Sequence, residues 1–147
     1  MKVVLQRCHY ASCTVDHQII SEIEHGLTLF VGFTENDSPS DLDTLIKKII
    51  HLRIFNDEKG LMNKNILETK GSILSISQFT LFADTKKGNR PSFGKALNRE
   101  EAKILYQQFN QKLNQFVPTK TGIFGADMLI KLENDGPVTI LLDSKEK

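Results

Sequence analysis

The most chemically suggestive run in this sequence is Ser77-Gln78-Phe79-Thr80, which places three hydrogen-bonding side chains in an otherwise apolar, strand-like stretch. Because side chains alternate between the two faces of a strand, we expect Ser77 and Phe79 on one face and Gln78 and Thr80 on the other. Buried polar groups need partners, and a substrate can supply them. Two interpretations stay open here: the polar lining of a pocket, or an ordinary half-exposed strand face.

A second unusual segment is Asn134-Asp135-Gly136-Pro137-Val138-Thr139, which lies between two apolar runs typical of strands. Asp-Gly is a strong signal for a hairpin turn, but Pro137 opens the returning strand without an N–H group, so one ladder hydrogen bond is lost. Gly-Pro permits a cis peptide bond and leaves carbonyl groups with little side chain around them. The segment is predicted to be a turn whose backbone is suited to meet a ligand.

The basic candidates are one loop and one isolated arginine. Lys86, Lys87, Arg90 and Lys95 are concentrated in a stretch that also contains glycine and proline. This pattern fits either a solvated loop or a loop that holds phosphates. Arg7 ends the first predicted strand in apolar surroundings, where its guanidinium needs an acceptor such as a backbone carbonyl unless it reaches solvent.

Several common kinds of active site have no counterpart in the sequence. It contains no Gly-x-Ser-x-Gly elbow, no Gly-x-Gly-x-x-Gly or Walker sequence, and no His-Glu-x-x-His spacing. We interpret the four histidines as surface or packing residues, and Cys8 and Cys13 as unreactive reduced thiols. The sequence therefore predicts no metal and no cofactor, and hydrolytic chemistry would have to depend on the substrate or on the backbone.

The length of 147 residues predicts a single domain, with residues 144–147 as a polar tail. A formal charge of +1 excludes a strongly basic nucleic-acid binder, so any RNA contact must be local. The chain runs directly into a strand pattern without an apolar signal segment, and no apolar run of 18 residues occurs. These features predict a cytoplasmic protein that does not enter a membrane.

The elements that must position these residues follow from periodicity. Strands are predicted at residues 3–7, 12–16, 19–23, 26–33, 73–82, 128–133 and 138–142. One amphipathic helix is predicted after Ser38 as N-cap with Pro39 in its first turn, and a second after Asn98 with Glu101 three residues on. Residues 56–60 favour a turn over a calcium loop. Two long amphipathic helices among about seven strands predict an α+β domain with a mostly antiparallel or mixed sheet.

Four separated motifs, in this order, resemble D-aminoacyl-tRNA deacylases of the D-Tyr-tRNA deacylase type. They are Ser-Gln-Phe-Thr-Leu at 77–81, Arg-Pro-Ser-Phe at 90–93, Phe-Gly-Ala-Asp-Met at 124–128 and Asn-Asp-Gly-Pro-Val-Thr at 134–139. The segments 4–7 and 52–55 also resemble the family, so the resemblance extends from residue 1 to about residue 143. It implies a barrel-like deacylase fold and a homodimer with its active site at the subunit interface.

The activity that the resemblance implies is hydrolysis of the ester bond of D-aminoacyl-tRNA, and of glycyl-tRNA mischarged on tRNA-Ala, as chiral proofreading in translation. A cis Gly136-Pro137 bond is implied to reach into the site of the other subunit, where its carbonyls receive the substrate amino group and exclude an L side chain. Water is implied as the attacking group, with help from the tRNA 2′-hydroxyl. A covalent Thr80 intermediate is the second choice, because no base is adjacent in sequence.

The resemblance also implies roles for single residues. Gln78, Phe79 and Thr80 are the implied catalytic residues. The implied substrate-binding residues are Arg7, which orients the Gly-Pro element, Ser77, Phe124 and Met128, with the last two beside the terminal adenine. Lys86, Lys87 and Arg90 are the implied contacts of the tRNA backbone.

Two alternatives belong to other classes of protein. The first is a binding module that keeps this fold and associates with tRNA or DNA without turnover, using residues 86–95 as its contact strip. The second is a generic esterase that cleaves small activated esters without tRNA. On the preferred interpretation the partners are the 3′ ends of D-aminoacyl-tRNA and glycyl-tRNA, and neither DNA nor a membrane is expected.

Overall fold

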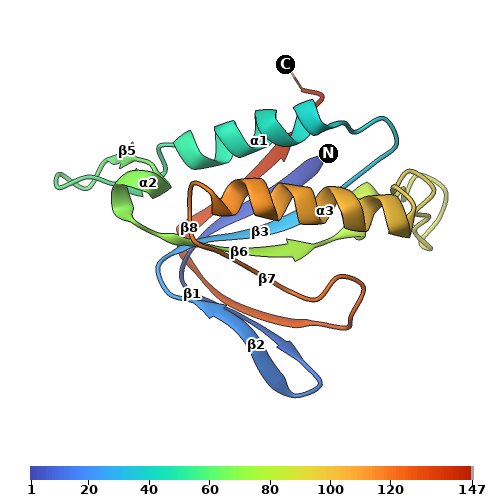
Figure 1. The fold of residues 1–147 in the computed structure, drawn as a ribbon, viewed down its shortest axis with the longest axis horizontal. Helices are drawn as coiled ribbons and strands as arrows, with labels where there is room; N and C mark the ends of the chain where they lie inside the picture. The colour runs from blue at the N-terminus through green and yellow to red at the C-terminus, as the bar shows by residue number, and fades with distance from the viewer. Residues whose placement is uncertain (147) are drawn as a thin grey trace.

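Two long helices lie side by side on one face of a curled mixed sheet (Figure 1). The computed structural model describes residues 1–146. The strands are β1 Lys2–Val15, β2 Gln18–Ile23, β3 Gly26–Gly32, β4 Phe55–Asn56, β5 Met62–Lys64, β6 Ser72–Ser77, β7 Thr119–Thr121 and β8 Leu129–Asp143. The helices are α1 Pro39–His51, α2 Ile66–Thr69 and α3 Arg99–Asn114, with a 3-10 helix η1 at Phe79–Phe82. The predicted α+β class with a mixed sheet is confirmed.

The sheet is organised around β1. Its strand order is β2-β1-β3-β6-β7, and β8 also pairs with β1. β1 is antiparallel to β2, β3 and β8, whereas β6 is parallel to both β3 and β7. The first half of β1 pairs with β3 and its second half with β2, while β8 follows it along most of its length. The sheet therefore curls along β1 into a nearly closed, barrel-like form.

Both long helices begin where the sequence predicted. Ser38 is the N-cap of α1, and its N–H donates to Asp41 Oδ2 at 2.9 Å. Asn98 is the N-cap of α3, and its side chain accepts from the N–H of Glu101 at 3.1 Å. These caps satisfy backbone donors that a helix start leaves free, so both predictions are confirmed.

The apolar residues form two clusters, one on each side of the sheet. The larger cluster joins the apolar faces of α1 and α3 to inward residues of β1, β3 and β6. The smaller cluster lies inside the curl and joins Cys8, Cys13, Leu74 and Ile76 to the partly buried Ile130 and Leu132 of β8. Because β6 contributes to both clusters, it is buried on both faces, which accounts for its nearly continuous apolar sequence.

Two strand predictions need correction. The strands predicted at 3–7 and 12–16 are one continuous strand, β1, in which a bulge sets two residues, 9 and 10, opposite a single residue of β8. The strand predicted at 73–82 ends at Ser77, and the chain turns into η1. Alternation within residues 77–80 therefore does not decide which way their side chains point.

The hairpin predicted at Asp135-Gly136 is also wrong, because β8 is one strand of 15 residues. Gln6 pairs with Thr139 and Cys8 with Asn134, so four residues of β8, 135–138, stand opposite Arg7 alone. They form a bulged loop that leaves the ladder. Asn134 closes this loop locally, since its side-chain oxygen accepts from the N–H of Val138 at 2.8 Å. Pro137 thus occupies a position at which no ladder hydrogen bond is required.

The remaining segments are short. Residues 56–60 form the predicted turn, in which Asp57 Oδ1 accepts from the N–H groups of Lys59 and Leu61. The predicted polar tail is in part anchored, because Lys145 Nζ donates to Asp41 Oδ1 at 2.9 Å. Lys147 lies outside the described residues. Within residues 1–146, no helix has the length and apolar character needed to cross a membrane.

Candidate active site

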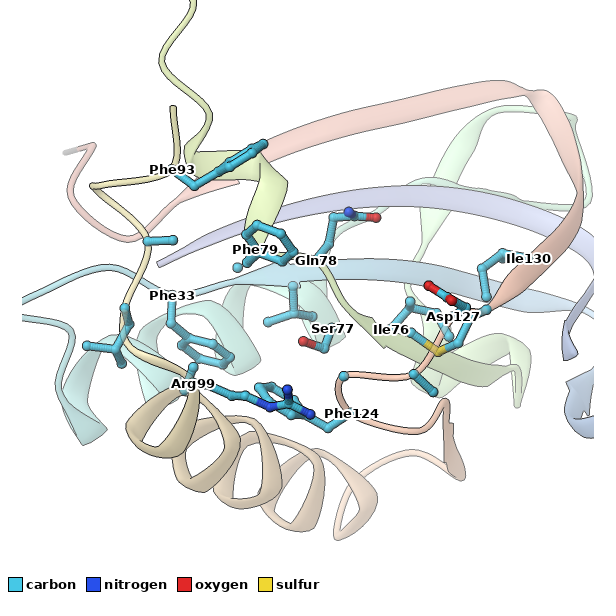
Figure 2. Close-up of a pocket in the computed structure, with 18 residues that line it drawn as sticks. Phe33, Ile76, Ser77, Gln78, Phe79, Phe93, Arg99, Phe124, Asp127 and Ile130 are labelled. Carbon is cyan, nitrogen blue, oxygen red and sulfur yellow. The ribbon is translucent and has the colours of Figure 1, made fainter. Parts of the chain in front are cut away.

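A cavity of about 590 Å³ opens at one end of the sheet (Figure 2). The ends of β3 and β6, the start of η1, the start of α3 and the segment before β8 all contribute to its wall. Of the residues predicted from the sequence, the cavity brings together Ser77, Gln78, Phe79, Phe124 and Met128. Two segments that are almost 50 positions apart in the chain therefore face one space.

Gln78 stands at the junction where β6 becomes η1. Its N–H donates to the carbonyl of Val31 at 2.7 Å, which ties the junction to the end of β3. Its side-chain Nε2 donates to Thr80 Oγ1 at 2.5 Å. Thr80 does not line the cavity. The contact between Gln78 and Thr80 thus arises from a helical turn and not from strand alternation.

Aromatic side chains form two parts of the wall. Phe79 and Phe93 meet edge to face with ring centroids 5.0 Å apart, and their exposed side chains form the lip of the cavity. On the other side, Phe124 lies against Tyr106, with ring centroids 5.8 Å apart. The cavity therefore offers aromatic faces from η1 and from the segment before β8.

Tyr106 of α3 packs behind Phe124 and supports this second part of the wall. The side chain is buried on α3, and its hydroxyl donates to the carbonyl of Ser75 at 2.7 Å. Ser75 precedes the polar run by two residues, so this hydrogen bond joins α3 to the strand that carries Ser77 and Gln78. Burial raises the pKa of Tyr106 to about 12.

Replacing Tyr106 with phenylalanine is expected to lower the free energy of unfolding by about 0.5–1.5 kcal/mol, because the Ser75 carbonyl loses one of its two donors and keeps the N–H of Gly122. The phenol holds its proton more tightly in the folded state, so the stability linked to this proton is complete below pH 10 and is lost as the pH rises toward 12. Denaturant unfolding measures this effect. Between pH 10 and pH 12, the free energy of unfolding of the wild type should fall by on the order of 2 kcal/mol more than that of Tyr106→Phe. Parallel pH profiles would contradict this role.

Arg7 and Asp135 hold the bulged loop of β8. Arg7 Nε donates to the backbone carbonyl of Asp135 and also lies 3.1 Å from the side-chain Oδ2 of Asp135. Arg7 Nη1 donates to the backbone carbonyl of Ile54 at 2.6 Å. His9 Nε2 lies 3.3 Å from the other Asp135 oxygen. The expectation that Arg7 finds a backbone carbonyl is confirmed, and this buried side chain fixes the residue next to Gly136.

The Gly136-Pro137 peptide bond is cis, and both residues are exposed. Neither lines the cavity of its own chain, and neither does Arg7. The loop lies opposite Arg7, which pairs with Leu27, whereas the cavity begins at Val31. Four residues along a strand span about 13 Å, so the loop and the cavity are separate within one chain.

The predicted basic loop is present. Asp84 links the two ends of this loop, since it accepts from the N–H of Lys86 and forms an ion pair with Lys95 at 3.3 Å. Lys86, Lys87 and Arg90 are exposed, and within residues 1–146 they form no ion pair. They do not line the cavity, although Phe93 from the same loop does.

Gly32, Arg99 and Asp127 are among the residues of the cavity wall to which the sequence analysis gave no role. Gly32 lies against the Gln78 backbone, where an added Cβ would stand 2.8 Å from the Gln78 carbonyl oxygen. A glycine that ends a buried strand is a signal for such close approach. Arg99 occupies the first turn of α3, where acidic residues are favoured, and this anomaly is a second signal. Asp127 carried no signal beyond its place in a motif.

The chemistry of the wall is that of binding and orientation. In the described part of the chain, no group of three or more His, Cys, Asp or Glu residues is arranged to hold a metal ion. Cys8 and Cys13 are buried, and burial raises the pKa of both thiols, which keeps them protonated as the sequence suggested. The cavity itself is lined by one serine hydroxyl, one amide, aromatic rings and two charged groups, and by no histidine.

Comparison with known proteins agrees with this arrangement. A family described as "D-Tyr-tRNA(Tyr) deacylase" matches residues 4–143. A solved structure titled "c-Myc DNA Unwinding Element Binding Protein" is 39% identical, with 99% of this chain and 100% of that chain covered and a TM-score of 0.94. Another, titled "Structural Analysis of a probable eukaryotic D-amino acid tRNA deacylase", shares the fold at 17% identity, with 96% and 97% covered and a TM-score of 0.81. The chain thus belongs to the D-Tyr-tRNA deacylase family of hydrolases, which act on the ester bond of aminoacyl-tRNA.

Proposed function

We propose that this chain hydrolyses D-aminoacyl-tRNA and glycyl-tRNA mischarged on tRNA-Ala, and rejects L-aminoacyl-tRNA. The observation that carries the proposal is the meeting of Ser77, Gln78 and Phe79 with Phe124 and Met128 around one cavity. The first group offers polar and backbone contacts to an aminoacyl ester. The second offers an aromatic face and a thioether, which suit the terminal adenine. An ester and a base that are joined through one ribose would fit these two walls.

The proposed reaction is attack of water on the ester, with the substrate 2′-hydroxyl assisting. The first N–H groups of η1, those of Phe79 and Thr80, lack acceptors within the helix, and no backbone hydrogen bond from them occurs in residues 1–146. Phe79 lines the cavity, so its N–H is the proposed donor to the developing oxyanion. Thr80 acts by holding the Gln78 amide, because its hydroxyl accepts from Nε2 and does not reach the cavity wall.

Chiral selection is assigned to Gly136-Pro137 of a second subunit. In one chain this exposed loop lies about 13 Å along the sheet from the cavity and does not border it, which supports its assignment to the cavity of the partner in a homodimer. Arg7 and Asp135 hold it rigidly, as a steric filter requires. Its carbonyls would receive the substrate amino group and occupy the space of an L side chain, whereas glycine would pass.

The tRNA itself would be held by local charge, since the net charge of the chain is only +1. Lys86, Lys87 and Arg90 are exposed beside the lip of the cavity, and each is proposed to contact a backbone phosphate. On this proposal the enzyme acts in the cytoplasm, where charged tRNA is used.

The decisive experiment measures deacylation of matched D-Tyr-, L-Tyr- and glycyl-tRNA by one preparation. We expect the D-tyrosyl and glycyl esters to be hydrolysed at least about 100-fold faster than the L-tyrosyl ester, because steric exclusion by a fixed backbone is worth several kcal/mol. Equal rates for the D and L esters would contradict chiral selection. Binding without turnover would favour the binding module instead, and one solved relative is titled as a DNA element binding protein. Cleavage of small activated esters without tRNA would favour a generic esterase.

A further inference from the structure

Arg99 is a wall residue of the cavity with no role in the proposed chemistry. Its guanidinium covers the backbone of Gly125: a Cβ added there would stand 2.5 Å from Nη2, 3.1 Å from Cζ and 3.4 Å from Nε. Figure 2 shows the side chain extending from the start of α3 toward Phe124. The absence of a side chain at Gly125, whose φ is +77°, leaves the space that the guanidinium occupies.

No charge in the described part of the chain explains this placement. Arg99 opens α3, where the positive end of the helix dipole disfavours a cation. Asp127 lines the same cavity, and Glu100 and Glu101 are its neighbours in the helix, yet within residues 1–146 Arg99 forms neither an ion pair nor a side-chain hydrogen bond. Arg99 is held over the backbone of Gly125 with its N–H donors unpaired among the described residues, so it can donate to an acceptor on a bound ligand.

The position of Arg99 indicates which acceptor that is. On the proposed function, the ester lies near Ser77 and Gln78 and the adenine near Phe124. Arg99 adjoins Phe124 at the start of α3, and in Figure 1 this start lies at the same end of the molecule as the basic loop of residues 84–95. The RNA strand would therefore leave the cavity past Arg99 on its way to Lys86 and Lys87.

We propose that Arg99 binds the phosphate group on the 5′ side of the terminal adenosine, and so positions the nucleoside for hydrolysis. This inference rests on the proposed function. The planar guanidinium presents paired N–H donors that match two phosphate oxygens, which lysine does not. Arg99 is thus a positioning residue that couples recognition of the RNA backbone to placement of the ester.

The test compares two small substrates, D-tyrosyl-adenosine and the same ester with a 5′-phosphate. We expect wild type to prefer the phosphorylated ester by about 10-fold in kcat/KM, mainly through KM, since a hydrogen bond to a charged group contributes about that much. Arg99→Gln should reduce this preference to about one, and Arg99→Lys should restore part of it. Lys103→Gln removes one charge from the same helix outside the cavity and should keep the wild-type preference.

Each outcome separates the two proposals. If wild type hydrolyses neither ester, nor D-Tyr-tRNA, the proposed function fails. If wild type hydrolyses both esters and Arg99→Gln keeps the full preference for the phosphate, the role of Arg99 is overturned and the deacylase remains. An equal loss on both esters would mean that Arg99 contacts the base or the ester, which also overturns phosphate recognition. If Lys103→Gln also lost the preference for the phosphorylated ester, the effect would come from overall charge, which again overturns the role of Arg99.

Discussion

Replacing Gly136 with valine is expected to lower D-aminoacyl-tRNA deacylation by at least about 100-fold, because displacement of a positioning group by about 1 Å has effects of this size. The residue has φ = +126°, a region that side chains rarely adopt. A Cβ there would lie 3.0 Å from Arg7 Nη2 and 3.0 Å from Val138 Cγ2. Because Arg7 is held by the carbonyls of Asp135 and Ile54, we expect the loop to move away from it, and its carbonyls to move with the loop. Single-turnover rates with D-Tyr-tRNA measure the effect.

The matched control is Gly60→Val. Gly60 also has a positive φ, +78°, but an added Cβ meets nothing within 4 Å, and the residue lies in the turn between β4 and β5. It therefore reproduces the backbone strain without the clash. Thermal unfolding of both variants separates loss of structure from loss of the site, and Gly136→Ala provides a smaller perturbation of the same kind. Wild-type activity in a folded Gly136→Val protein would rule out a functional role for this loop.

The parts of the fold that local rules govern were predicted well. Capping residues and apolar periodicity fixed the starts of α1 and α3, because both depend on neighbours three or four positions away. The course of β1 and β8 depends instead on their mutual pairing, between residues that are 115 to 141 positions apart in sequence. Asp135-Gly136 carries a strong local hairpin signal, and only that distant pairing turns it into a bulged loop.

The same distinction applies to the site. Period-two alternation placed Gln78 and Thr80 on one strand face, but the chain leaves the strand at Ser77, and tertiary packing of Gln78 on Gly32 decides the turn. The five predicted residues that share the cavity were found through motifs, since composition alone favoured an ordinary half-exposed strand face for residues 77–80. Arg99 belongs to no quoted motif, and only its unfavourable place in the helix distinguishes it.

Gly32→Ala is expected to lower kcat/KM for D-Tyr-tRNA by about 10- to 100-fold and the free energy of unfolding by about 1–3 kcal/mol. The added Cβ would stand 2.8 Å from the Gln78 carbonyl oxygen and 3.2 Å from Leu81 Cβ. The Gln78 N–H is already tied to Val31, so the backbone cannot yield without breaking the junction that aims Phe79. Gly94→Ala, in the loop beside the cavity, meets nothing within 4 Å and should retain activity.

The two glycine variants together test whether each site is shared between subunits. Gly32 lies in the cavity wall and Gly136 in the loop assigned to the partner, so a mixed dimer of Gly32→Ala and Gly136→Val subunits places both defects in one site and leaves the other intact. Unfolding and refolding an equal mixture gives half mixed dimers, so activity should recover to about one quarter of wild type. If each site were built from a single chain, every site in every dimer would carry a defect, and mixing would restore nothing.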